Sequence, residues 1–236
     1  MALALSGALA LGCTQEDKTI VKVDGGKILG VETSIEGVYA FKGVPYAAPP
    51  IGNLRWKEPQ PVIPWDGVRP ADDFSAAAVQ DPHIGNSNPY NSEFFFQGDP
   101  PLSEDCLYLN VWTPAPGERS RKLPVAIWIH GGAYTGGWGF EPEMDGKEKP
   151  HDMKGAFHSS ELWYVFHSQD HSDRPFTPLD KILADHVNDC WVNFVKTGDP
   201  GRGWLPYTPE HPLYMVFQLT PNETDDASAM MPPLEP

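Results

Sequence analysis

The sequence has little positive charge, few cysteines, and no apolar run at its start long enough to cross a membrane. Lys and Arg number 17 against 32 Asp and Glu, which gives a formal net charge of −15 at pH 7. This balance argues against a basic face that binds nucleic acid or an anionic membrane. Three cysteines are too few for a disulfide framework. A globular protein without a polyanionic partner is therefore expected.

The first 12 residues form an uncharged apolar run that ends at Cys13. The run is too short for a transmembrane helix but suits the apolar region of a signal peptide. The residues before Cys13 resemble a bacterial lipoprotein processing site, where the cysteine is lipidated. We expect an exported protein, either secreted, periplasmic or lipid-anchored at the cell envelope through Cys13. The alternative is an apolar tail of no consequence.

The 26 prolines and 22 glycines predict a loop-rich chain with short elements. Residues 19–23 and 27–31 alternate like strands around Asp24-Gly25-Gly26, a hairpin signal, and residues 38–42 would extend this meander. Residues 43–103 contain many prolines and are expected to be mostly irregular, with a short alanine-rich helix possible at 73–80.

Two further strands are expected, at 107–112 and at 125–129. The second is almost entirely apolar, which predicts burial on both faces. Residues 178–197 are the clearest helix, because Thr177 is a suitable N-cap, Pro178 suits the first turn and Gly198 follows the last. Its apolar face comprises Leu183, Val187, Trp191, Phe194 and Val195. A short strand at 213–219 and a fraying tail complete the chain.

Four stretches in a fixed order resemble the type-B carboxylesterase family of α/β hydrolases, which includes the cholinesterases. The Ser103-to-Val111 stretch is the most specific of them. The matching stretches are FKGVPYA at 41–47 with LRW at 54–56, SEDCLYLNV at 103–111, WIHGGAY at 128–134, and GAFHSSEL at 155–162 followed by RPF at 174–176 and FVKTGDP at 194–200.

The resemblance implies hydrolysis of small carboxylic esters through an acyl-serine, with no cofactor. Such an enzyme needs a nucleophile, a base, an acid that orients the base, and amide donors for the oxyanion. The implied donors are the amides of Gly132 and Ala133, in a turn that includes Gly131. The implied base is His158, and Glu161 matches a position that supports the histidine loop.

The resemblance also implies a structural pair and a free thiol. Arg55 and Glu104 match residues that form an internal salt bridge, and loss of one partner from a buried pair would cost a few kcal/mol. Cys106 matches a position that is often disulfide-bonded to an upstream cysteine. Residues 78–80 stand where that partner would be and contain no cysteine, so Cys106 is expected to be a buried free thiol.

The nucleophile is missing. No Gly-x-Ser-x-Gly sequence occurs between Gly132 and His158, or anywhere else in the chain. In the family a long segment between these two residues supplies parallel strands, the nucleophile turn and the triad acid. Each parallel strand needs a crossover of a dozen or more residues, so residues 133–157 have no room for several such units. Ser159 and Ser160 are adjacent to the base but do not follow the expected strand.

The expected fold is therefore an incomplete α/β-hydrolase domain that keeps its mostly antiparallel N-terminal strands and lacks most central parallel strands. We place a leader and linker at 1–18, a single truncated domain at 19–219 and a flexible tail at 220–236. The domain consists of an N-terminal part, 19–148, and a C-terminal part, 155–219. The strand at 125–129 would lose its neighbours, so self-association through its edge is expected.

A metal site is not expected. His167, Asp170, His171 and Asp173 could be grouped as ligands, but this stretch matches a family loop without metal and lacks a tight ligand spacing.

Three interpretations remain open. The first is a carboxylesterase-family chain that is impaired or inactive. The second is a non-catalytic exported binding or adhesion protein. The third is a gene-prediction fragment of an active esterase, which the nucleotide sequence across codons 146–155 would reveal.

Overall fold

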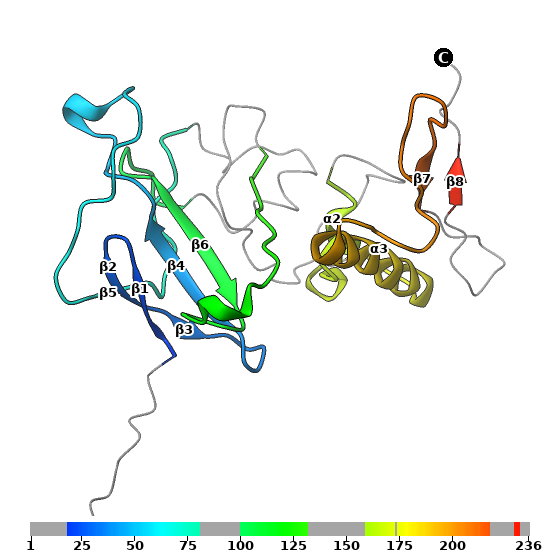
Figure 1. Ribbon diagram of the computed structural model, residues 1–236, viewed down its shortest axis with the longest axis horizontal. Coiled ribbons are helices and arrows are strands. Elements are labelled where there is room, and N and C mark those ends of the chain that lie inside the picture. Colours follow the sequence, from blue (N-terminus) through cyan, green and yellow to red (C-terminus); the bar gives the residue numbers. More distant parts are fainter. Residues whose placement is uncertain (1–17, 81–99, 132–158, 173, 218–228, 232–236) are drawn as a thin grey trace, which may run out of the picture. The chain divides into compact units, whose positions relative to one another are not determined.

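The computed structural model describes residues 18–80, 100–131, 159–172, 174–217 and 229–231. Their contacts divide the chain into two units, which we describe separately. Unit 1 comprises Met1–Ala78 and Leu102–Arg121, and unit 2 comprises Val79–Pro101 and Lys122–Pro236. The described elements are a mixture of helices and small sheets (Figure 1).

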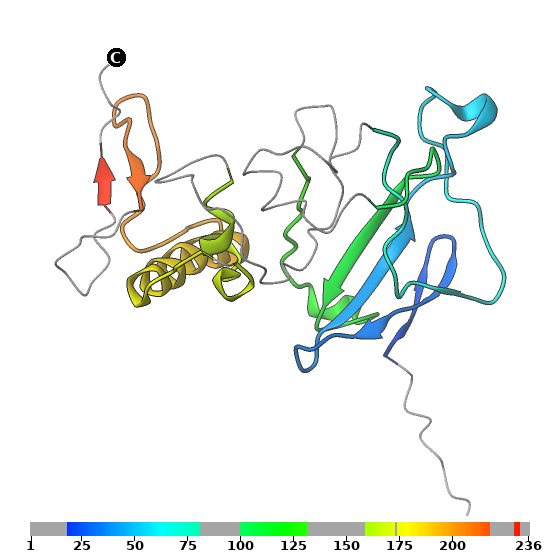
Figure 2. The ribbon, with the colours of Figure 1, turned by 180° about the vertical axis from the view of Figure 1, so that it is seen from behind.

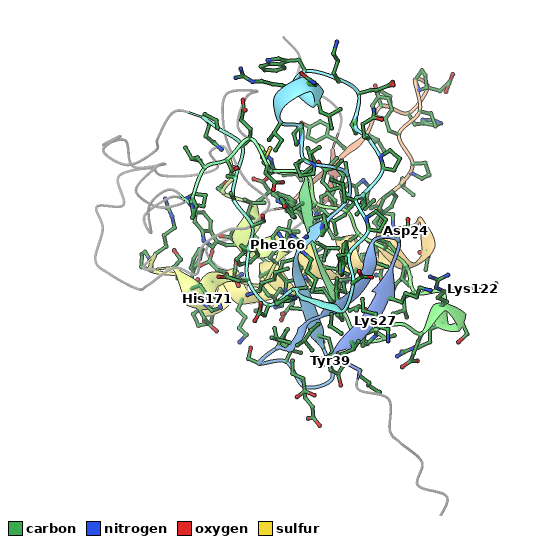
Figure 3. All side chains as sticks on the ribbon, turned by 90° about the vertical axis from the view of Figure 1, so that its left-hand side faces the viewer. Asp24, Lys27, Tyr39, Lys122, Phe166 and His171 are labelled. Atoms are coloured by element: carbon green, nitrogen blue, oxygen red, sulfur yellow. The ribbon has the colours of Figure 1, made fainter. Side chains whose placement is uncertain are left out.

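The predicted hairpin is confirmed at the start of unit 1. Strand β1 (Ile20–Val23) pairs antiparallel with β2 (Gly26–Leu29), and β5 (Val68–Pro70) adds parallel to β2. Glycine is needed in the turn because Trp65 lies against it: a Cβ on Gly25 would fall 2.0 Å from the Trp65 ring. The indole N–H of Trp65 donates to the carbonyl of Lys27 at 2.8 Å. Asp24, in this turn, and Lys27, in β2, are labelled in Figure 3.

A second sheet of unit 1 has the order β3 (Val31–Glu32), β4 (Tyr39–Pro45) and β6 (Tyr108–Thr113). All of its pairs are antiparallel, and β4 and β6 run side by side in Figures 1 and 2. The predicted strand at 107–112 is thus confirmed, shifted by one residue. The strand predicted at 38–42 exists, but it pairs in this sheet and does not extend the hairpin.

An irregularity between Phe41 and Val44 interrupts the β4–β6 register. Gly43 lies there with a φ of 61°, a conformation that glycine adopts without strain. Its amide donates to Asn110 Oδ1 at 2.9 Å, and the amide of Lys42 donates to the carbonyl of Ala71 at 2.7 Å. The bulge therefore turns backbone groups of β4 toward the loop after β5.

The core of unit 1 joins its two sheets. It comprises the buried side chains of Ile28, Phe41, Val44 and Ala71, with Val21, Val23, Tyr39 and Trp65 packed around them. The helix predicted at 73–80 is wrong. Ala77 instead forms a parallel bridge with Leu102, and its carbonyl accepts from the amide of Ser103 at 2.9 Å. Pairing with a distant segment has overridden the local helix preference of the alanines.

Two short 3₁₀ turns complete unit 1. They are η1 (Gly52–Leu54) and η2 (Arg119–Arg121).

The long helix of unit 2 is confirmed with its predicted bounds, as α3 (Pro178–Thr197). The Thr177 side chain accepts from the amide of Asp180, the Asp180 carboxylate accepts from the amide of Thr177, and Gly198 ends the helix in the left-handed conformation. The buried face comprises Leu183, Ala184, His186, Val187 and Cys190. Leu183 and Val187 of the expected apolar face are buried, whereas Trp191, Phe194 and Val195 at its C-terminal end are 48%, 53% and 37% exposed.

A short helix, α2 (Leu162–Val165), packs against α3 and precedes the 3₁₀ turn η3 (Gln169–His171). Two hydrogen bonds tie α2 to α3. The Tyr164 hydroxyl donates to Asp180 Oδ1 at 2.8 Å, and the Asn188 side-chain amide donates to the carbonyl of Val165 at 2.7 Å. Asp180 therefore both caps α3 and holds α2 in place.

Asp180 is the N3 residue of the capping box, and replacing it by asparagine is expected to lower the stability of unit 2 by about 1 kcal/mol, the usual worth of a capping interaction. Burial acts to raise the pKa of Asp180, but hydrogen bonds from the amide and hydroxyl of Thr177 and from Tyr164 outweigh it and lower that pKa below 3.8. The contribution of the carboxylate is therefore complete above that value and is lost as pH falls through the lowered pKa.

Amide hydrogen exchange in α3, compared at pH 6 and pH 3, measures this effect. The matched control is Asp170→Asn, because Asp170 is an exposed acid of the same unit. An equal effect of both substitutions at pH 6 would contradict the assignment.

Unit 2 ends in two paired strands, β7 (Tyr214–Val216) and β8 (Ala229–Met231), which lie antiparallel (Figure 2). The strand predicted at 213–219 thus exists in a shorter form. The prediction that the chain frays from residue 220 is wrong for residues 229–231, because β7 supplies them with a backbone partner.

The strand predicted at 125–129 is absent, and its predicted burial is wrong. The side chains of Val125, Ile127 and Ile129 are 77%, 82% and 83% exposed. An apolar sequence forms a buried strand only where neighbouring strands cover it, and no described strand pairs with these residues.

Candidate functional site

The residues expected to perform catalysis lie outside the described part of the chain. These are the oxyanion donors Gly132 and Ala133 and the base His158. Cys13, the candidate lipidation site, and Asp173 also lie outside it. The described neighbours of the expected site are Gly131 and Glu161, and both belong to unit 2. Their roles therefore remain predictions.

Gly131 is exposed and ends a run of residues without regular secondary structure. Its carbonyl accepts from the His130 ring, with 2.7 Å between Nδ1 and the oxygen. This contact requires the proton on Nδ1. Apart from the neighbours of Gly131 in the sequence, no described residue has an atom within 4 Å of a Cβ built on Gly131. Gly131, at the start of the expected oxyanion turn, is thus exposed, and its one hydrogen bond to a described residue is local.

Glu161 ends the turn that leads into α2, at the N-cap position of that helix, and it is exposed. Its carbonyl accepts from the amides of Tyr164 and Val165 at 3.0 and 2.9 Å. The side chain makes no capping bond to the helix. The backbone of Glu161 therefore shapes the segment that follows His158, and support of the histidine loop by its carboxylate stays a prediction.

Arg55 and Glu104 form an ion pair in unit 1. The pair is not internal: its side chains are 58% and 42% exposed. The expected cost of a few kcal/mol for breaking it assumed burial and is wrong. Solvent screens an exposed pair, so we assign it about 0–1 kcal/mol. The Arg55 guanidinium also lies 5.8 Å from the centre of the Trp56 ring.

The two described cysteines could in principle replace a missing serine nucleophile, but neither is activated. Cys106 is a free thiol, and it is half-buried where full burial was expected. Burial, and then the charges of Asp105 and Glu104, raise the pKa of the Cys106 thiol. Burial also raises the pKa of Cys190. A raised pKa keeps a thiol protonated near neutral pH, and the thiol form is a poor nucleophile.

The buried histidine of α3 was not predicted. His186 is 8% exposed, and its ring packs edge-on against Phe217 with centroids 5.4 Å apart. Burial, with a smaller contribution from Arg202, lowers its pKa. The ring is therefore neutral at pH 7 and packs in the core of unit 2. Only its position on the buried face of the helix could have indicated this role.

A shallow cleft of about 210 Å³ lies in unit 1. Proline, aliphatic and Trp56 side chains form most of its lining, and Lys57, Glu58 and Gln60 are its polar residues. Trp56 is 90% exposed and has a φ of 60°. The cleft contains no candidate nucleophile and no histidine, so it lacks the groups that ester hydrolysis requires.

Within the described ranges, no three His, Cys, Asp or Glu residues are grouped as a metal ion would require. His167 instead lies 3.3 Å from a carboxylate oxygen of Asp185, in an exposed contact. None of the described helices is long and apolar enough to cross a membrane.

Comparison with known proteins identifies the family. The model of the carboxylesterase family matches residues 17–148 and 138–231. Pig (Sus scrofa) liver carboxylesterase is 36% identical over 196 residues, which covers 77% of this chain and 33% of the relative. Phenmedipham hydrolase from Pseudarthrobacter oxydans is 46% identical over 107 residues, covering 45% of this chain and 20% of the hydrolase.

Among solved structures, a thermophilic pNB esterase is 39% identical, with a TM-score of 0.44 over 55% of this chain and 25% of the esterase. The carboxylesterase of Geobacillus stearothermophilus, determined at pH 6.8, is also 39% identical, with a TM-score of 0.39 over 50% of this chain and 21% of that enzyme.

The chain spans about a third of the length of the pig, mouse and rat carboxylesterases that it matches. The two segments of the family match together extend over most of the sequence. The chain belongs to the carboxylesterase family.

Proposed function

We propose that this chain retains parts of an ester-hydrolase site without forming an acyl-serine, and that it is impaired or inactive as an esterase. The retained parts are the oxyanion turn at Gly131, Gly132 and Ala133 and the base His158. An incomplete α/β-hydrolase fold is part of this proposal. The single observation behind it is that no Gly-x-Ser-x-Gly sequence exists in a chain that contains the flanking motifs.

The chemistry of the described residues supports the proposal. Acyl transfer needs a nucleophile that a neighbouring base can deprotonate. Both described cysteines have raised pKa values. A site with oxyanion donors and a base but no nucleophile keeps only weak residual catalysis.

Hydrolysis of p-nitrophenyl butyrate by the purified chain tests the proposal. The expected rate is only slightly above that of the buffer, and His158→Ala changes it little. The matched control is His211→Ala, since His211 is an exposed histidine of the same unit. Turnover that His158→Ala abolishes and His211→Ala preserves would overturn the proposal, because it would show that a His158-dependent nucleophile exists.

A non-catalytic binding function is the second candidate. The exposed apolar side chains at 125–129 favour it, because exposed patches of this kind are typical of interaction sites.

A further inference from the structure

The segment at 123–131, here called the open segment, combines three properties. It contains no charged residue apart from the titratable ring of His130. Every one of its residues is exposed. It belongs to no helix or strand, and it runs uncoiled in green after η2 in Figure 1. Exposed Val and Ile side chains are costly in water, so contact with another surface would stabilise them.

The backbone of the open segment is also available for pairing. Among the described residues, no backbone hydrogen bond joins its amides or carbonyls to another backbone group. Its one hydrogen bond to a described residue is that between the His130 ring and the carbonyl of Gly131. A run of open N–H and C=O groups, with Val and Ile at alternate positions, is a template for strand pairing.

The side chains of the segment differ in their surroundings. Trp128 packs edge-on against Phe166, with ring centroids 5.6 Å apart, and is half-exposed. Phe166, labelled in Figure 3, ends α2. Successive side chains of an extended chain point to opposite sides. When the segment extends into a strand, Val125, Ile127 and Ile129 therefore share one apolar side, opposite Trp128.

We propose that the open segment pairs with the same segment of a second copy of this chain. The two segments lie antiparallel about a two-fold axis through Ile127. This arrangement places Val125 of each copy opposite Ile129 of the other and keeps all six side chains on one face. It also satisfies backbone groups that are otherwise left to water.

The distribution of charge favours the open segment, over other parts of the surface, as the site where a second copy of the chain binds. Each chain has a net charge of −15, so two copies repel each other. The open segment has no acidic residue, so pairing there brings no carboxylates into register. It also offers no charge that a complementary partner of another kind would recognise. Added salt screens the repulsion between copies and should therefore strengthen the association.

The pair is expected to be weak. Two short strands bury less than the roughly 1,200 Å² of a standard protein interface. Each strand also keeps a second edge, so larger species should follow the dimer at high concentration.

Sedimentation velocity of the full chain over a range of protein and salt concentrations tests the proposal. A monomer–dimer equilibrium that shifts toward dimer with salt is expected. Ile127→Lys places two like charges opposite each other across the axis and should weaken the dimer at least about tenfold. The matched control is Ile35→Lys: Ile35 is 65% exposed in unit 1, so this substitution should leave the equilibrium unchanged.

Hydrogen exchange of the same samples identifies the surface that pairs. Amide protection at 125–129 should rise with concentration in the parent protein and in Ile35→Lys, but not in Ile127→Lys. A monomer at every concentration would overturn the proposal. Equal association of both variants, or protection that rises elsewhere while 125–129 stays open, would overturn it as well, because the contact would then lie outside the open segment.

Discussion

Replacing Phe41 by alanine is expected to lower the free energy of unfolding of unit 1 by about 3–5 kcal/mol. The Phe41 ring is 3% exposed and lies in the core between the two sheets of the unit. A Cβ built on Gly30 would fall 2.7 Å from this ring, so the surrounding backbone is closely packed. Domains of this size are stable by only about 5–15 kcal/mol. The substitution should therefore leave a large fraction of unit 1 unfolded.

Urea denaturation, with amide exchange in β4 as a local probe, measures this loss. Ile35→Ala is the matched control, because the Ile35 side chain is 65% exposed. It should change the stability by no more than about 0.5 kcal/mol. A loss below about 1 kcal/mol for Phe41→Ala would contradict the assigned core.

Replacing Trp163 by alanine is expected to destabilise unit 2 by a similar amount, about 3–5 kcal/mol. Trp163 is the buried residue of α2 and is 4% exposed. Its ring lies 6.0 Å from that of Phe176, and the Arg174 guanidinium lies 5.1 Å above it. Loss of the cation–π contact adds about 0.5–1 kcal/mol to the cost of the cavity.

Amide exchange at Ala184 and Val187 of α3 is the local probe for this loss. Trp191→Ala serves as the control, since Trp191 is 48% exposed on the same helix. It should produce a clearly smaller loss. Equal effects of the two substitutions would contradict the assignment of Trp163 to the core of unit 2.

Local sequence signals were sufficient for elements whose backbone hydrogen-bonding groups are paired by residues nearby in the sequence. The hairpin of β1 and β2 forms around a turn with two glycines, as expected. Helix α3 has the predicted N-cap, proline and terminal glycine because these groups satisfy the ends of the helix from nearby residues. Such features require no information about distant parts of the chain.

Local sequence signals failed where secondary structure or burial depends on residues distant in the sequence. The alanines at 76–78 favour a helix, yet Ala77 bridges to Leu102. The apolar run at 125–129 favours a buried strand, yet it lies exposed without a partner strand. The β3–β4–β6 sheet likewise pairs residues more than sixty positions apart, such as Ala40 and Trp112.

The candidate site likewise has features that local sequence predicts and features that depend on distant residues. The sequence motifs identified the family, which the family model confirms. The Arg55–Glu104 pair is present, but its exposure depends on the surrounding fold and was predicted wrongly. The position of His186 on its helix could indicate burial, but its packing partner Phe217 lies far along the chain, and local pattern could not indicate that contact.

The most direct test of the central claim is covalent labelling with a fluorophosphonate, which reacts with serines activated by a general base. Intact-mass measurement of the parent chain and of His158→Ala would detect any adduct. The account predicts no adduct on either protein at a reagent concentration that labels pig liver carboxylesterase to completion. One adduct per chain at a serine, lost in His158→Ala and retained in His211→Ala, would contradict it.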